Sequence, residues 1–245
     1  MVIALRHIIF WAVPITILFI VLRAQIVRTI LGSGAFSWND TRLTAAALAL
    51  FSLSVLTQSL TVLFSRGYHA SGNTRKPLFI NLFSSVCAIG GAFWLTIVFE
   101  KTPEFRYFIE SILRVDQIDG TAVLMLPLAY SIASIMNAFL HWIIFERDFE
   151  MNLSLIIRKT LFESFSASVL MGFVAYNCLN IFELILNTET VIGIFLQGFL
   201  SGIIGIIAGV VILRILKNDE IKEISLALHK KFWKVDLLAP AQEEL

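Results

Sequence analysis

Two sets of polar side chains lie inside strongly hydrophobic stretches of the sequence and are the residues most able to bind a polar ligand. Within each set the residues recur at steps of four, three and four positions. The sets are Ser54, Gln58, Thr61 and Ser65, and Tyr130, Ser134, Asn137 and His141. Steps of three and four place all members of a set on one face of a helix. Each set therefore predicts a polar stripe along a hydrophobic helix.

A polar stripe of this kind either lines a solvated path or joins neighbouring helices through hydrogen bonds, which contribute around 0.6 kcal/mol each. Joining helices is the commoner role of serine and threonine. An unpaired amide or imidazole costs more to bury than a hydroxyl. We therefore expect a substrate cavity with contributions from Gln58, Tyr130, Asn137 and His141, and helix packing stays open as the alternative.

A third pattern consists of glycines in the last hydrophobic stretch. Gly198, Gly202, Gly205 and Gly209 again follow steps of four, three and four. One edge of this helix has no side chains, so another backbone can approach it closely. The spacing predicts a packing face against the preceding hydrophobic stretch, and a groove for a lipid tail is the functional alternative.

Enzymatic chemistry has little support in the sequence. There is no G-x-x-x-x-G-K-[ST] loop for a nucleotide, no H-E-x-x-H motif and no Cys/His cluster at metal spacing. The cysteines, Cys87 and Cys178, lie in apolar runs. The formal net charge of +1 provides no basic field for nucleic acid. We expect a protein that is not an enzyme, with no cofactor, no metal and no nucleic-acid partner.

The elements that carry these residues are membrane helices. The chain has 245 residues, of which 58% are hydrophobic and 15% charged, whereas soluble domains carry about 25% charged residues. Six stretches contain no Asp, Glu, Lys or Arg: 8–22, 44–64, 77–99, 121–145, 164–182 and 190–213. A helix needs about 20 apolar residues to cross a bilayer. We predict an all-α polytopic integral membrane protein with six transmembrane helices, the first continuing beyond Arg23 to reach sufficient length.

Basic residues predict the orientation, because they resist translocation. If the amino terminus is cytoplasmic, thirteen of the nineteen Lys and Arg residues fall on the inner side and six on the outer side. Both termini are therefore expected in the cytoplasm, with 100–119 as an outer loop. Residues 217–245 follow an amphipathic pattern, with Ile221, Ile224, Leu228 and Phe232 at helical spacing. This tail is expected along the inner membrane surface, or else as a solvated helix.

Two short motifs resemble those of one transporter family. Gly34-Ala35-Phe36, followed by Asp40-Thr41 and Thr44-Ala45, resembles a signature of the MurJ/MviN lipid II flippases. The segment 68–77, Y-H-A-S-G-N-T-R-K-P, is similar to the family's F-Y-A-x-G-D-T-R-T-P loop. The resemblance covers roughly residues 3–145 and includes the segment around Asn137.

The second motif also has a physical interpretation that does not depend on the resemblance. Gly72 permits a tight turn, and Pro77 suits the first turn of the next helix. The basic pair Arg75 and Lys76 holds this end of the chain among cytoplasmic headgroups. We therefore treat Gly72, Asn73, Thr74, Arg75 and Pro77 as a loop that anchors the topology.

The resemblance implies that the six stretches correspond to helices 9 to 14 of a fourteen-helix flippase of the larger MOP exporter superfamily. Residues 1–146 would be four helices of the second lobe, 147–216 two helices forming a groove for the undecaprenyl tail, and 217–245 the cytoplasmic tail. The implied function is flipping of lipid II, the undecaprenyl-linked peptidoglycan precursor, across the bacterial inner membrane by alternating access, in support of cell-wall synthesis and cell shape.

Alternating access needs two bundles, so the resemblance further implies a separate chain that supplies the first lobe. Two other functions stay open. One is export of other lipid-linked polysaccharide units by a related transporter, and the other is a truncated membrane scaffold that transports nothing.

Overall fold

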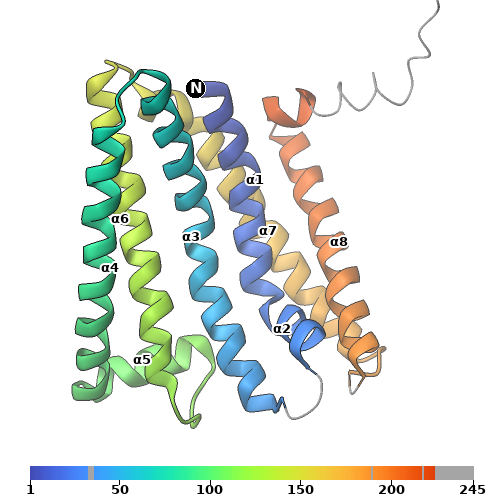
Figure 1. Cartoon of the computed structure of the whole chain (residues 1–245). Coiled ribbons are helices and arrows are strands. Elements are labelled where there is room, and N and C mark those ends of the chain that lie inside the picture. Colours follow the sequence, from blue (N-terminus) through green and yellow to red (C-terminus); the bar gives the residue numbers. More distant parts are fainter. Residues whose placement is uncertain (33–35, 189, 217, 224–245) are drawn as a thin grey trace, which may run out of the picture.

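The computed structural model describes residues 1–32, 36–188, 190–216 and 218–223, and the helices form a single bundle (Figure 1). Within these ranges the structure contains helices and no strand. Six helices are long and apolar enough to cross a membrane: α1 (Val2–Val21), α3 (Trp38–Ala70), α4 (Arg75–Lys101), α6 (Met125–Asp148, preceded by the short turn η1, Thr121–Leu124), α7 (Leu153–Glu183) and α8 (Val191–Ile215). The predicted all-α polytopic membrane fold is confirmed.

The first membrane helix differs from the prediction at both ends. α1 begins at Val2 and ends at Val21, and its 20 residues are sufficient to span a bilayer. The chain bends at Leu22, and a separate helix, α2 (Arg23–Leu31), follows. The expected continuation of the first helix beyond Arg23 is therefore wrong. The length comes from the amino-terminal side, where Leu5 and Ile9 are completely buried in the bundle.

The segment expected as an outer loop contains a helix of its own, α5 (Pro103–Leu113), which lies across the end of the bundle (Figure 1). Pro103 is its first residue, a position where the missing N–H costs nothing. On its inner side, the buried Glu110 accepts hydrogen bonds at Oε1 from Arg106 Nε (2.8 Å) and Thr121 Oγ1 (2.6 Å). These bonds fasten α5 to the start of η1.

Asp40 of the first family-like motif caps the start of α3 together with Ser37. Ser37 Oγ accepts a hydrogen bond from the Asp40 backbone N–H (3.2 Å), and Asp40 Oδ2 accepts one from the Ser37 N–H (2.8 Å). This reciprocal arrangement satisfies backbone donors that a helix start otherwise leaves unpaired. Thr41, the next motif residue, is fully buried and donates from Oγ1 to the Ser37 carbonyl.

Helix α6 organises the half of the bundle that holds the polar stripes. Both α3 and α4 pack along α6, whereas α3 and α4 barely touch each other. Ser131 Oγ of α6 donates to the Leu50 carbonyl of α3 (2.6 Å), which helps to hold these two helices in register. The other half consists of α1, α7 and α8, with α7 in contact with both of its neighbours. The three-helix arrangement of α3, α4 and α6 leaves space between α3 and α4.

A charged cluster joins α1, α7 and the segment after α8, at the end of the bundle that holds the amino terminus (Figure 1). Arg6 bonds to Glu220, and Asn218 Nδ2 donates to Glu163 Oε2 (2.7 Å). Lys159 Nζ lies 3.2 Å from Asp219 Oδ2. We call this set, completed by Thr160, the end clasp. Of the predicted amphipathic tail 217–245, the structure describes residues 218–223, and the rest lies outside the described residues.

Candidate functional site

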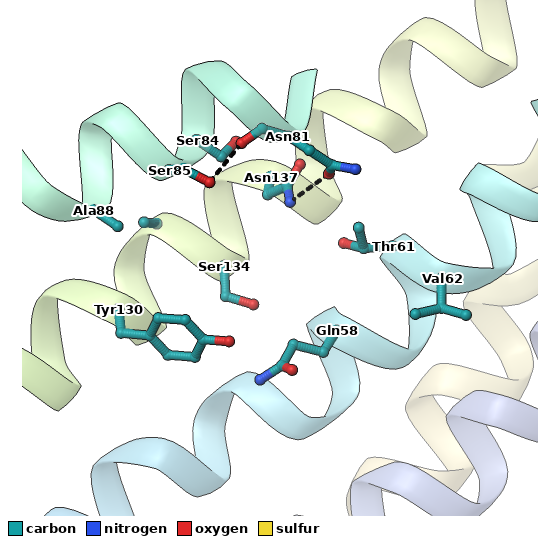
Figure 2. A pocket seen from close by; sticks show the side chains of 11 residues that line it. Gln58, Thr61, Val62, Asn81, Ser84, Ser85, Ala88, Tyr130, Ser134 and Asn137 are labelled. Carbon is teal, nitrogen blue, oxygen red and sulfur yellow. Dashed lines mark hydrogen bonds between the residues drawn. The ribbon is translucent and has the colours of Figure 1, made fainter. Parts of the chain in front are cut away.

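A pocket of about 270 Å³ opens between α3, α4 and α6. Figure 2 shows side chains from all three helices pointing into it. Its lining is Gln58, Thr61 and Val62 from α3, Asn81, Ser84, Ser85 and Ala88 from α4, and Tyr130, Ala133, Ser134 and Asn137 from α6. The pocket exists because α3 and α4, which both pack along α6, diverge from each other, and because small side chains such as Ala88, Ala133 and Ser84 leave the space unfilled.

Asn137 and Asn81 form the polar centre of one wall. Asn137 Nδ2 donates to Asn81 Oδ1 at 3.0 Å, which links α6 to α4 (Figure 2). Asn137 Oδ1 and the hydroxyl of Ser84 are buried and have no hydrogen-bond partner in the described part of the chain. Buried polar atoms without partners are costly. These two atoms are therefore available to a ligand or to water inside the pocket.

The opposite wall is held by one hydrogen bond within α3 and one between α3 and α6. Gln58 Nε2 donates to Ser54 Oγ at 2.7 Å, which leaves the amide oxygen of Gln58 free of described partners. Ser134 Oγ lies 2.8 Å from Thr57 Oγ1. Tyr130 reaches into the same space from α6, and its side chain is exposed.

Eight of the eleven lining residues have polar, uncharged side chains, and the other three are Val62, Ala88 and Ala133. Amides and hydroxyls both donate and accept hydrogen bonds, and the Tyr130 ring adds an apolar face. None of the eleven lining residues carries a formal charge. The pocket can thus recognise hydroxyl and amide groups of a ligand, but its own side chains cannot neutralise a phosphate.

Three of the four residues predicted for the cavity meet here: Gln58, Tyr130 and Asn137 all line the pocket. His141 does not. Its side chain is completely buried one helical turn beyond Asn137, where its Nδ1 lies 3.1 Å from the Asn137 carbonyl oxygen. His141 Nε2 has no partner among the described residues.

We did not predict from the sequence that α4 contributes to the cavity. Asn81, Ser84, Ser85 and Ala88 line the pocket from this helix. Their separations of three, four and seven residues are the same helical signal that singled out the other two stripes. The signal was available, but this stripe is shorter and lies in the least buried of the six spans.

The glycine face of α8 is covered by other helices along its length. A Cβ at Gly205 would lie 2.9 Å from Ala175 Cβ of α7, and one at Gly209 would lie 3.2 Å from Met171 Sδ. Nearer the start of α8 the neighbours are different: Gly198 faces Gln25 of α2, and Gly202 faces Leu22. The face thus contacts α7, the helix expected from the sequence, and also the α1–α2 bend.

The loop between α3 and α4 adopts a tight turn. Gly72 has a φ of +77°, which favours glycine, and Asn73 Oδ1 accepts a hydrogen bond from the Lys76 N–H (3.4 Å). Thr74 precedes α4, which starts at Arg75 and has Pro77 in its first turn. Lys76 Nζ lies 2.5 Å from Asp148 Oδ2, which ties the loop to the end of α6.

Comparison with known proteins identifies the family. The model of the family described as "Lipid II flippase MurJ" matches residues 1–200. The chain belongs to the MurJ family. The MurJ match includes all of the pocket and the first ten residues of α8, and so extends beyond the part of the chain covered by the sequence motifs. Neither the curated proteins nor the solved structures contain a match to this chain.

Membership places the chain among membrane transporters rather than catalytic enzymes at the level of the family. It agrees with the six membrane-length helices. The MurJ-like signature at residues 34–45 is described from Phe36 onward and leads into the capped start of α3, while Gly34 and Ala35 lie outside the described residues.

Proposed function

We propose that this chain forms one lobe of a flippase that moves lipid II, an undecaprenyl-linked peptidoglycan precursor, across the bacterial inner membrane. The single observation that carries the proposal is the MurJ family match over residues 1–200. The uncharged pocket between three membrane helices supports it, because transporters build their substrate sites between membrane helices. Movement of this kind breaks no covalent bond.

In this proposal the pocket contacts the uncharged part of the headgroup, its sugars and amides. The free oxygens of Gln58 and Asn137 and the hydroxyl of Tyr130 suit hydroxyl and amide partners. His141 does not contact the ligand in this proposal and instead helps to position Asn137 through its contact with the Asn137 carbonyl. The pyrophosphate needs cationic partners from elsewhere, because the pocket lining has none.

A second bundle is part of the proposal, since alternating access rocks one bundle against another around a shared site. We expect it to be supplied by a separate chain and to face α4, because only 17% of the most apolar segment of this helix is buried within the described bundle. Apolar residues such as Phe79, Phe83 and Val86 are exposed on this helix. They provide the contact surface that a second bundle requires.

The proposed orientation has the end clasp and both termini in the cytoplasm, because most basic residues belong to that side. Residues 1–146 would hold the headgroup. Residues 147–216 would contact the undecaprenyl tail, with the glycine face of α8 setting how closely α8 approaches α7. Residues 217–245 would lie on the inner membrane surface.

A reconstituted flipping assay tests the proposal. The chain is placed in vesicles with fluorescent lipid II, with and without candidate first-lobe chains, and flipping is compared for the unmodified chain, Asn137→Ala and Asn177→Ala. Asn177 is a matched control, because it lies on α7 and donates to the Phe173 carbonyl within its own helix. We expect Asn137→Ala to slow flipping roughly tenfold, as one buried hydrogen bond contributes about 1–2 kcal/mol, and Asn177→Ala to have no effect.

Three results would contradict the proposal. Flipping unchanged by Asn137→Ala would remove the pocket from the mechanism. Absence of lipid II flipping with every first-lobe chain, alongside transport of another polysaccharide-linked lipid, would assign the chain to a related exporter. Absence of all transport would favour a scaffold.

A further inference from the structure

Three arginines from different elements lie close together at the end of the bundle where α2 and α5 are found. Arg23 Nη2 of α2 donates to the Leu113 carbonyl at 3.2 Å. Arg42 of α3 donates to the neighbouring carbonyl, that of Arg114, from Nε at 2.9 Å and also from Nη2. Because the two carbonyls are adjacent in the chain, the arginines are brought close together. We call Arg23, Arg42 and Arg114 the arginine cluster.

Within the described residues the cluster has no carboxylate partner. None of its members forms an ion pair within 4.0 Å in the described part of the chain. Burial lowers the pKa of Arg23, and repulsion from Arg114 lowers that pKa further. Like charges held together without a counter-ion are unfavourable. The arrangement therefore calls for an anion from outside the described residues.

Capping of α5 explains only part of this arrangement. Arginine near a helix C-terminus binds the last carbonyls and favours the helix dipole, and both acceptor carbonyls are at the end of α5. A guanidinium has five N–H donors, of which Arg23 uses one for this cap. The Arg114 side chain is exposed and forms no hydrogen bond to the described residues, so it has no part in the cap. Donors remain for a ligand.

The depth of the cluster points to the class of anion. The outer face of α5 exposes Tyr107, Phe108 and Ile112, each by 59% or more, while Leu113 is buried against the bundle. A helix of this amphipathic kind at the end of a membrane bundle lies at the level of the lipid headgroups. Trp38, at the start of α3, is exposed at the same end. Phosphate is the anion present at this depth.

We propose that Arg23, Arg42 and Arg114 form a binding site for the phosphate group of an anionic membrane lipid. Arg42 and Arg23 provide planar guanidinium donors that match phosphate oxygens, and Arg114 adds an exposed charge. The site lies at the opposite end of the bundle from the end clasp (Figure 1). It is separate from the polar pocket, with which it shares no residue.

Native mass spectrometry of the full chain in detergent tests the site, with phosphatidylglycerol and the zwitterionic phosphatidylcholine as probes. We expect the unmodified chain to bind phosphatidylglycerol selectively and Arg114→Asn to weaken this binding about fivefold. Asparagine suits position 114, where φ is +59°, and the change leaves both capping carbonyls in place. The double variant Arg42→Gln/Arg114→Asn should lose the selectivity. Arg158→Gln removes one exposed charge at the other end and should change nothing.

The site would be refuted by equal binding of the two lipids to the unmodified chain, or by equal weakening in Arg114→Asn and Arg158→Gln, which would indicate a general surface charge. Displacement of phosphatidylglycerol by inorganic pyrophosphate as efficiently as by added lipid would assign the arginines to a soluble anion and overturn the lipid assignment. Thermal unfolding of Arg114→Asn at the temperature of the unmodified chain shows that the fold is intact.

Discussion

Arg6 and Glu220 lie 214 positions apart in the sequence, and Arg6 Nε lies 2.7 Å from Glu220 Oε1. Thr160 Oγ1 of α7 donates to the same carboxylate oxygen at 3.2 Å. Glu220 is only 3% exposed. The contact joins the first helix, the fifth membrane span and the segment after the last span at one point, and both Asn218 and Glu220 of that segment are buried in the bundle.

Removing Arg6 should lower the free energy of unfolding more than neutralising Glu220. Arg6→Met leaves the buried Glu220 carboxylate with one hydroxyl donor, and we expect the free energy of unfolding to fall by about 2 kcal/mol. Glu220→Gln keeps an oxygen that can accept from Thr160 and should cost about 1 kcal/mol. Unfolding in mixed detergent micelles measures both values.

The double variant Arg6→Met/Glu220→Gln provides the control for direct interaction. Residues in contact show non-additive effects, so the double variant should be more stable than the sum of the two single losses predicts. Strict additivity would show that the two residues do not interact in the folded protein.

The end clasp should weaken in acid through Asp219. The hydrogen bond from Lys159, with the charges of Lys159 and Lys222, holds the pKa of Asp219 below its ordinary value. A lowered folded pKa means that the stabilisation is complete above the ordinary pKa of about 3.9 and is lost as the pH falls through the lower value. Asp219→Asn should therefore remove part of the decrease in melting temperature between pH 5 and pH 3. An identical pH profile in the variant would exclude this role.

Hydrophobic length was sufficient to predict the six spans, because the bilayer fixes how many apolar residues a crossing helix needs. It could not reveal α2 and α5, which are short, contain charged residues and are stabilised by contacts with the rest of the bundle. No proline or glycine at Leu22 indicates from the sequence that the helix ends there. Pairs such as Arg6 and Glu220 depend on the fold and have no local signature.

Spacing identified the faces of α3 and α6 that line the pocket, including Gln58 and Asn137. The prediction that His141 lines the cavity was wrong. Periodicity shows which side of a helix a residue occupies, but it does not show which neighbouring helices cover that residue. At the level of His141 the bundle is closed, and the neighbouring Ala138 and Phe145 belong to the core shared with α1, α3 and α7. One turn earlier, the divergence of α3 from α4 leaves Asn137 accessible to the pocket.

The turn between α3 and α4 should require glycine at position 72. Its φ of +77° is unfavourable for residues with a Cβ, and Gly72→Ala should lower the free energy of unfolding by about 1 kcal/mol. The loss reflects backbone conformation alone, because a Cβ at this position meets nothing within 4 Å. Gly72→Asn should be milder, since asparagine adopts positive φ more readily. Equal melting temperatures for Gly72→Ala and the unmodified chain would contradict this explanation.

The contact between α7 and α8 should be most sensitive at Gly205. A Cβ there would lie 2.9 Å from Ala175 Cβ and 3.2 Å from the Met171 carbonyl oxygen, so the helices must move apart. Gly205→Ala should lower the free energy of unfolding by about 1–3 kcal/mol, the usual cost of overpacking. Gly209→Ala should cost less, because its nearest neighbour is the flexible side chain of Met171. Melting temperatures in one detergent rank the two variants.

Gly90 supplies the matched control for these substitutions. It lies within α4, and a Cβ there would have no neighbour within 4 Å. Gly90→Ala should leave the melting temperature unchanged or raise it slightly, since alanine favours the helix by up to about 1 kcal/mol. If Gly205→Ala and Gly90→Ala behaved alike, close approach of α8 to α7 would not be the reason for glycine at position 205. A loss confined to Gly205→Ala would locate the tight contact at Ala175.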